Sequence, residues 1–195
     1  IAMALPGSHD EDEAVGVPLP GVQLDIVDGD DKPLAQGEAG HIRLKAPGMA
    51  TGYLDGGAET AARFAGGWFR PGDIGLLRSD GSLVVKGRRD DMMILNGLNI
   101  FPVEIERVLE RHPAVAVAAA LPLASSVHGQ IPVAAVELRP GAIATPAELQ
   151  AYAHEHLALR CPRRVLVLAA LPRNSQGKIM RRDIANLFRP SGSTS

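Results

Sequence analysis

Alternating apolar and polar residues, interrupted by glycine-rich turns, characterise the first part of the chain. Residues 22–27 and 41–45 each alternate in this way, which is the period-2 pattern of a half-buried strand. Residues 74–77 and 83–86 predict two more strands, joined as a hairpin by a Ser-Asp-Gly turn. Two prolines and two glycines within residues 16–21 instead predict a rigid turn. The pattern favours a small β-barrel or sandwich.

Helical spacing of apolar residues appears after residue 100. Ile105, Val108, Leu109 and His112 recur at i, i+3, i+4 and i+7, which places them on one face of a helix. Pro102 suits the first turn of that helix, because an N–H there would have no intrahelical partner. A helix is therefore predicted from about Pro102 to the next proline in the sequence.

The rest of the second part reads as a mixed α/β unit. Residues 115–121 and 132–138 are nearly continuous apolar runs, as expected of strands buried between layers. Thr145 and Glu148 have the spacing of a capping box, so a helix is predicted from there to about residue 159. A third strand at 165–168 and a closing helix at 182–188 complete the predicted elements.

A charged segment joins these two unlike parts. It begins Gly87-Arg88-Arg89-Asp90-Asp91 and continues through an apolar run to Pro102. Such a joint is a candidate hinge, since hinges lie at element ends where few residues absorb the change in φ and ψ. We predict an α+β fold: a β-rich domain at residues 1–89, a small mixed α/β domain with a three-stranded sheet at 90–189, and a flexible tail at 190–195.

Composition narrows the class of protein. Hydrophobic residues make up 46% and charged residues 22% of the 195, as in an ordinary globular protein. A net charge of -2 gives no electrostatic reason to expect nucleic acid or an anionic membrane as partner. No apolar run approaches the roughly 20 residues that a membrane span needs. A single cysteine, Cys161, excludes an intramolecular disulfide and fits a reducing cytoplasm. Because the sequence starts at Ile1 without a Met, a fragment or a processed chain is expected.

Three side chains are candidates for chemistry, and each has a simpler interpretation. Asp73, in a glycine-dense loop, is suited to binding two ribose hydroxyls, although turn aspartates commonly accept their own backbone N–H. Arg88 can clamp phosphate through its planar fork, or form a surface ion pair with a neighbouring acid. Lys178, in a polar loop, can stabilise developing negative charge, although most loop lysines are merely solvated. The spacing around Lys178 does not fit a P-loop, and no Cys/His set has zinc spacing.

Four motifs, taken together and in order, resemble the adenylate-forming superfamily of acyl-CoA synthetases, peptide-synthetase adenylation domains and luciferases. They cover nearly the whole chain, and the stretch after residue 87 most resembles the acyl- and aryl-CoA ligases. The motifs are Gly40-His41-Ile42-Arg43-Leu44-Lys45 with Gly52-Tyr53-Leu54, Gly67-Trp68-Phe69-Arg70-Pro71-Gly72-Asp73, Gly87-Arg88-Arg89-Asp90-Asp91, and Leu171-Pro172-Arg173-Asn174-Ser175-Gln176-Gly177-Lys178-Ile179.

The resemblance implies a reaction in two steps, in which a carboxylate and ATP give an acyl-adenylate and CoA thiol then displaces AMP. It implies that Asp73 holds the ribose hydroxyls and that Arg88 lies near ribose and the α-phosphate. Lys178 is then the lysine that contacts carboxylate and phosphate oxygens during adenylation. Asp90 is the hinge of a mobile C-terminal domain, and Gly97 lies in a loop that borders the pantetheine arm during thioester formation.

The chain also departs from the family pattern. Pro71 replaces the usual threonine of Thr-Gly-Asp, and Asn96 precedes Gly97 where a small or basic residue is common. The phosphate loop and the acyl pocket of the family lie upstream of Ile1, so residues 1–89 are expected to be the end of the large adenylating domain. Mg²⁺ ligands are expected outside this chain, and the chain alone is expected to be inactive. Two alternatives remain: a non-catalytic module, or an adenylation domain that loads a separate carrier protein.

Overall fold

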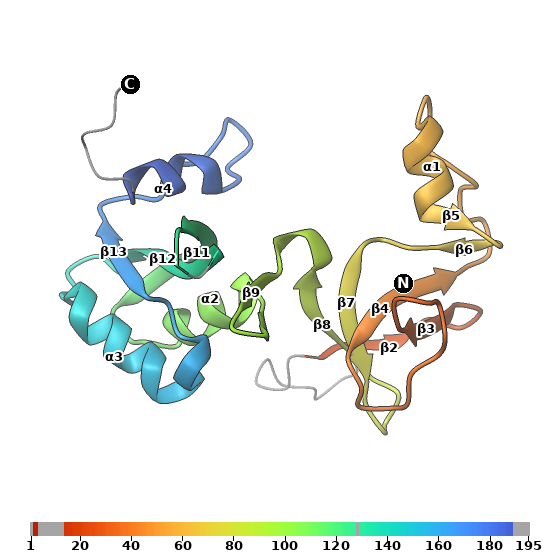
Figure 1. Cartoon of the computed structure of the whole chain (residues 1–195), viewed down its shortest axis with the longest axis horizontal. Helices are drawn as coiled ribbons and strands as arrows, with labels where there is room; N and C mark the ends of the chain where they lie inside the picture. The colour runs from red at the N-terminus through yellow and green to blue at the C-terminus, as the bar shows by residue number, and fades with distance from the viewer. Residues whose placement is uncertain (1, 4–13, 128, 189–195) are drawn as a thin grey trace. The chain divides into compact units, whose positions relative to one another are not determined.

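The computed structural model describes residues 2–3, 14–127 and 129–188 of the chain (Figure 1). The chain divides into two compact units, Ile1–Asp90 and Asp91–Ser195. The predicted flexible tail at 190–195 lies outside the described residues. In the part of the chain that is described, no helix is long and apolar enough to cross a membrane.

An antiparallel sheet of eight strands forms most of the first unit. Its strand order is β1-β2-β8-β7-β4-β6-β5, and β3 pairs with β4 beside this path. Hydrophobic side chains from three of the strands, Ile26, Ile42 and Leu83, are each only 4% exposed and form its core. The elements are β1 (Ala2–Met3), β2 (Ala14–Pro18), β3 (Gln23–Val27), β4 (Gly40–Lys45), α1 (Gly57–Arg63), β5 (Phe64–Ala65), β6 (Trp68–Phe69), β7 (Asp73–Leu77) and β8 (Leu83–Arg88).

The strands predicted at 22–27 and 41–45 from alternation, and at 74–77 and 83–86 as a hairpin, are confirmed as β3, β4, β7 and β8. The turn predicted at 16–21 is wrong in its first half, because β2 runs through Gly16 and ends at Pro18. Gly16 has φ +112° beside a shift in the register between β2 and β8, and a strand end tolerates proline. The glycine and proline there mark an irregular strand.

A three-stranded sheet with helices on both faces forms most of the second unit. In the order β11-β12-β13, the first pair is antiparallel and the second is parallel. The unit begins at Asp91, within a short 3₁₀ turn, η2 (Arg89–Asp91), that spans the division between the units. Its elements are β9 (Met93–Leu95), β10 (Leu98–Ile100), α2 (Pro102–Glu110), β11 (Val115–Ser125), β12 (Gly129–Leu138), α3 (Pro146–Leu157), η3 (Ala158–Arg160), β13 (Arg164–Leu168) and α4 (Arg181–Leu187).

Two hydrophobic clusters explain the continuous apolar runs of β11 and β12. One face of the sheet packs Ala118 and Ala120 against Leu109 of α2 and Leu149 of α3. The other face packs Leu121 and its neighbours against α4, which Figure 1 shows on the opposite side of the sheet from α3. Because both faces are covered, successive positions along β11 and β12 are apolar. The predicted α+β fold class with a three-stranded sheet is confirmed.

The capping box predicted at the start of α3 is present. The Glu148 backbone N–H donates to Thr145 Oγ1 at 3.2 Å, and the Thr145 N–H donates to Glu148 Oε2 at 2.8 Å. This bond from the Thr145 N–H is the main cause that lowers the pKa of Glu148, since it favours the ionised carboxylate. The helix ends at Leu157, close to the predicted residue 159.

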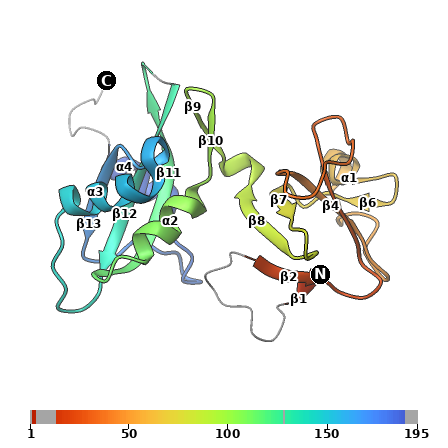
Figure 2. The same cartoon turned by 90° about the horizontal axis from the view of Figure 1, so that it is seen from below.

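A hairpin of β9 and β10 lies at the start of the second unit, where the sequence analysis found only an apolar run. Leu95 pairs with Leu98, so Asn96 and Gly97 form a two-residue turn with φ +50° and +80°. Positive φ at both positions is the type I′ pattern that Asn-Gly favours. Figure 2 shows this hairpin leading directly into α2. Gly97, which the family resemblance places near the pantetheine arm, is therefore the second residue of this turn.

Candidate functional site

A charged cavity of about 400 Å³ opens in the first unit. It lies among the turn after β3, the helix α1 and the loop that leads into β7. Arginine and aspartate side chains line it, among them Asp31, Arg63, Arg70 and Asp73. The lining offers both carboxylates and guanidinium groups, so the cavity can bind a ligand that has hydroxyl groups and an anionic group.

Two of the residues predicted to bind nucleotide face each other at one end of the β7–β8 pair. Asp73 begins β7 and Arg88 ends β8, and the antiparallel register places the two residues directly opposite. Arg88 Nη1 lies 3.4 Å from Asp73 Oδ1. The Asp73 side chain is 27% exposed and that of Arg88 is 50% exposed, so both remain reachable by a ligand. The register of a hairpin thus brings together two residues that are 15 positions apart in sequence.

The loop before Asp73 is held from two sides. Arg63, the last residue of α1, donates from Nη1 to the carbonyl oxygen of Pro71 at 2.7 Å. The backbone N–H of Arg89 donates to the carbonyl oxygen of Gly72 at 2.9 Å. Gly72 has φ +85°, which strains any L side chain, and a Cβ there would lie 2.2 Å from Arg63 Nη1 and would displace the guanidinium.

Sequence reasoning did not find Arg63. Its only local signal is Glu59, four residues earlier on the same helix, whose Oε1 lies 3.8 Å from Arg63 Nε. The contact that matters joins α1 to a loop eight residues later in the chain, and helical spacing gives no information about it.

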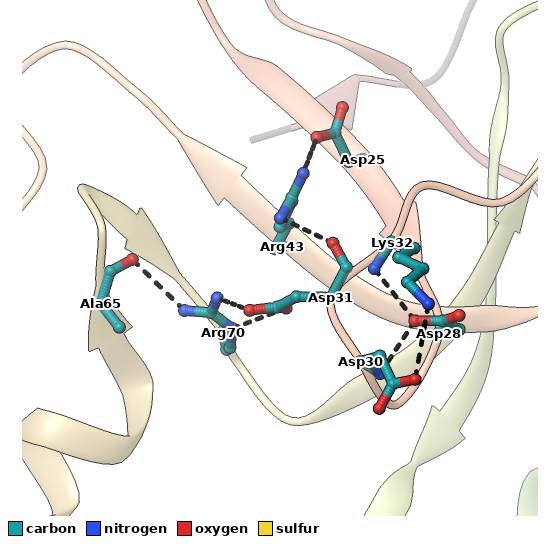
Figure 3. A network of polar contacts seen from close by, with 8 residues as sticks. All are labelled: Asp25, Asp28, Asp30, Asp31, Lys32, Arg43, Ala65 and Arg70. Carbon is teal, nitrogen blue, oxygen red and sulfur yellow. Dashed lines mark hydrogen bonds and ion pairs between the residues drawn. The ribbon is translucent and has the colours of Figure 1, made fainter.

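A network of ion pairs fixes the turn after β3 at the edge of the cavity (Figure 3). Arg70 donates through Nε and Nη2 to the two carboxylate oxygens of Asp31, and Arg43 Nη1 donates to the Asp31 carbonyl oxygen at 3.3 Å. Arg43 also binds Asp25, with 2.8 Å between Nη2 and Oδ2. The hydrogen bond from Arg70 is the main cause that lowers the pKa of Asp31. Asp31 is therefore ionised at neutral pH, and its left-handed backbone (φ +64°) is held by two arginines.

Asp28 stabilises the same turn from within. Its Oδ1 accepts the backbone N–H groups of Asp30 at 2.8 Å and Lys32 at 2.9 Å, which is an Asx-type turn. The bond from the Lys32 N–H is the main cause that lowers the pKa of Asp28. The cavity edge therefore presents carboxylates that are already ionised and already positioned.

Lys178 lies on a tight turn of the second unit. Asn174 Oδ1 accepts the backbone N–H groups of Gln176 at 3.0 Å and Lys178 at 2.8 Å, and the Asn174 N–H donates to the Lys178 carbonyl at 2.9 Å. Gly177 supplies the left-handed φ of +80° that the turn requires. The Lys178 side chain is exposed, and among residues 2–3, 14–127 and 129–188 its ammonium has no hydrogen-bond or ion-pair partner. A rigid turn thus presents a free cation.

The remaining predicted residues lie at turns as well. For Gly97, in the β9–β10 turn, no described residue other than its two chain neighbours has a heavy atom within 4 Å of the position of a Cβ. Asp90 lies in the short helical turn at the division between the units, and its Oδ1 is 3.4 Å from Arg89 Nε. Asp73 and Arg88 thus belong to the first unit, whereas Gly97 and Lys178 belong to the second.

Within the part of the chain that is described, no group of three His, Cys, Asp or Glu residues could hold a metal ion.

Comparison with known proteins gives a family match and close relatives. Residues 104–178 match the family described as "AMP-binding enzyme C-terminal domain". A 2-succinylbenzoate–CoA ligase from Geobacillus kaustophilus is 40% identical over 176 residues, which is 90% of this chain and 36% of the relative. A fatty acid–[acyl-carrier-protein] ligase from Streptomyces coeruleorubidus is 33% identical over 177 residues, 90% of this chain and 34% of the relative.

A solved structure resembles most of the chain. It is the o-succinylbenzoate CoA synthetase from Bacillus subtilis in complex with its acyl-adenylate intermediate. The TM-score is 0.81 at 34% sequence identity, and the match covers 90% of this chain and 36% of that one. The chain therefore spans about a third of the length of the proteins that it matches.

Proposed function

The chain belongs to the adenylate-forming family of AMP-binding enzymes, and we propose that it is the C-terminal part of an ATP-dependent acid–thiol ligase. In this proposal a carboxylate oxygen attacks the α-phosphorus of ATP, and pyrophosphate leaves. The thiol sulfur of coenzyme A then attacks the carbonyl carbon of the acyl-adenylate, and AMP leaves as the thioester forms. Both steps build negative charge on oxygen, which a positioned cation stabilises.

The observation that carries the proposal is the pairing of Asp73 with Arg88 beside the charged cavity. A carboxylate can accept hydrogen bonds from both hydroxyls of a ribose, and a guanidinium can donate to a phosphate or to ribose oxygen. With Asp73 27% exposed and its loop fixed by Arg63 and Arg89, the acid is accessible and preorganised. These two residues fit the nucleoside part of ATP or AMP.

The Lys178 ammonium has no partner within the described part of the chain, which supports a role in the first step. Its turn is fixed by Asn174, so the cation is presented with little freedom in the backbone. In the proposal it contacts carboxylate and phosphate oxygens while pyrophosphate leaves. Removing one such charge-stabilising group commonly costs roughly 10²–10³ in rate.

The two turns at the start of the second unit are proposed to serve the second step. Asp90 is the proposed hinge between a domain at 1–89, the end of the large adenylating domain, and a mobile domain at 90–189. Gly97 is proposed to border the pantetheine arm of CoA, and an open turn supports this role because, among the described residues beyond its chain neighbours, no heavy atom lies within 4 Å of its missing Cβ. The phosphate loop, acyl pocket and Mg²⁺ ligands are proposed to belong to a preceding part of the longer enzyme.

The test is carboxylate-dependent exchange between ATP and pyrophosphate, measured across a panel of fatty and aromatic acids. We expect exchange by the longer parent protein and none by this chain alone. The active acid names the substrate class. A well-folded parent that exchanges with no acid would reject the adenylating function in favour of a non-catalytic module.

A carrier-protein acceptor is the second candidate, and one relative favours it by name, since it is a ligase for an acyl-carrier protein. The two acceptors are separated by supplying the acyl-adenylate with either free CoA or a phosphopantetheinylated carrier protein. Thioester formation with CoA alone supports the main proposal, and formation with the carrier alone supports the alternative.

A further inference from the structure

The outer edge of β11 is closed by side chains instead of by another strand. β11 is the first strand of its sheet, and within the described residues it pairs only with β12. Its outward backbone N–H groups at Ala118 and Ala120 donate to Glu110 Oε1 at 3.1 Å and Glu106 Oε1 at 2.9 Å, both from α2. An unpaired strand edge is a site for unwanted pairing, so covering it with side-chain acceptors is physically reasonable.

Arg181 closes the same edge from the other side. Its Nε donates to the carbonyl oxygen of Ala120 at 3.2 Å, and its Nη2 donates to Glu106 Oε1 at 2.6 Å. Since Glu106 Oε1 also accepts from the Ala120 N–H, the three residues form a closed ring of hydrogen bonds. The planar fork of arginine is needed for this ring, because one ammonium cannot reproduce its two fixed donor directions.

The ring lies at the end of the turn that carries Lys178. Arg181 is the first residue of α4 and follows Lys178 by three positions. The backbone N–H of Met180 donates to the carbonyl oxygen of Pro172 at 2.8 Å, which closes the turn just before the arginine. At the other end of the turn, the Leu171 N–H donates to Glu137 Oε2 at 3.2 Å. The turn is thus tied to the sheet at both ends.

The ring is too exposed to be a major source of stability. The Arg181 side chain is 42% exposed and that of Glu106 is 15% exposed. Ion pairs that include a solvent-exposed partner typically contribute little to the free energy of unfolding. What the ring supplies is geometry, because it fixes the direction in which the chain leaves the Lys178 turn.

We propose that Arg181, held by Glu106, is a positioning residue that sets the location of the Lys178 ammonium for adenylation. This inference rests on the proposed function. The Gly97 turn does not depend on the ring, because the β9–β10 pairing and the buried residues Met93 and Ile100 hold it. The ring is therefore specific to the first half-reaction.

The experiment compares Arg181→Ala with Arg182→Ala in the longer parent enzyme. Arg182 is the matched control: it is the next residue of the same helix, its side chain is exposed, and it has no ion pair or hydrogen bond among the described residues. Arg181→Ala is expected to lower kcat for ATP–pyrophosphate exchange about 10- to 100-fold, with KM for ATP changed less than about threefold. Arg182→Ala is expected to change neither, and Arg181→Lys to give an intermediate kcat.

Two further measurements separate positioning from stability and from a failure of the proposed function. Thioester formation from supplied acyl-adenylate is expected to survive in Arg181→Ala. Hydrogen exchange at the Lys178 and Met180 amides is expected to be faster in Arg181→Ala than in Arg182→Ala, and this readout does not require activity. A parent that folds but is inactive would reject the proposed function. Hydrogen exchange would still test in that case whether the ring holds the Lys178 turn. Equal amide exchange in both variants, or equal loss of both half-reactions, would overturn the inference.

Discussion

The charged residues of the two units differ in how they are held. Asp31 and Asp28 accept several donors each, and those bonds lower the pKa of both carboxyls and fix the turn. Lys178, by contrast, has a fixed backbone and, in the described part of the chain, a free ammonium. A free cation on a rigid turn is suited to meeting a charge that develops elsewhere, because it has no partner to give up.

Lys178→Ala in the longer enzyme is expected to abolish adenylation and to spare thioester formation from supplied acyl-adenylate. The side chain is exposed, so the fold should keep its stability within about 0.5 kcal/mol. ATP–pyrophosphate exchange and CoA transfer, measured on the same preparation, check this. Equal loss of both half-reactions would contradict the proposed role.

Arg63→Ala is expected to loosen the loop that presents Asp73. The variant removes the 2.7 Å bond to the Pro71 carbonyl and leaves space over Gly72. A single lost hydrogen bond of this kind costs about 1 kcal/mol, so ATP binding is expected to weaken roughly tenfold or less. The measurement is KM for ATP in the exchange reaction. Arg63→Lys keeps the positive charge but lacks the planar guanidinium, so it should recover part of the ATP binding that Arg63→Ala loses. An unchanged KM for ATP in Arg63→Ala would show that the loop keeps its geometry without this hydrogen bond.

At the scale of elements, the β9–β10 turn separates a backbone effect from a packing effect. Gly97 has φ +80° but open space around its missing Cβ. Gly97→Ala is therefore expected to destabilise the second unit by about 1–2 kcal/mol through backbone strain alone. Urea unfolding measures this loss, and CoA transfer should slow more than adenylation. As the control, Asn96→Gly relaxes the neighbouring left-handed position and should stay within about 0.5 kcal/mol of the unmodified protein.

Local patterns in the sequence predicted most of the long elements and missed the short ones. Alternation revealed β3 and β4, and the Thr145–Glu148 spacing revealed α3, because each signal is contained within the element itself. The two-residue strands β5 and β6 are too short to show a period: they pair with each other across a tight turn, and β6 also pairs with the distant Leu44 of β4. The β9–β10 hairpin does carry a local signal, because Asn-Gly between apolar residues favours a type I′ turn.

The candidate site residues show the same contrast between signals that are local in sequence and contacts that are not. Asp73 and Arg88 were singled out from their motifs, but that they face each other depends on the β7–β8 register. The contacts of Arg63, Arg70 and Arg181 join elements that are distant in sequence, and no local pattern encodes them. The roles of these residues in a reaction stay predictions.

At the scale of the whole molecule, the residues proposed for the two half-reactions are divided between two compact units. Asp73 and Arg88 lie in the first unit, and Gly97 and Lys178 lie in the second. The division falls between Asp90 and Asp91, inside the short helical turn that follows β8. If one unit must serve two steps in succession, the backbone at this turn is where its φ and ψ angles have to change.

Asp90→Pro in the longer enzyme is expected to reverse the pattern of Lys178→Ala. Proline fixes φ near −65°, so it should freeze one arrangement of the domains, leaving adenylation intact while CoA transfer is lost. The lost side chain should matter little, because its contact with Arg89 is long, at 3.4 Å, and both side chains are 62% exposed.

Asp90→Ala is the control for the Asp90→Pro prediction. It removes the same carboxylate and keeps φ free, so both half-reactions should continue at close to the unmodified rates. Single-turnover CoA transfer from a supplied acyl-adenylate distinguishes the variants. Unchanged transfer by Asp90→Pro would place the hinge elsewhere, and equal loss in both variants would assign the effect to the carboxylate rather than to the backbone.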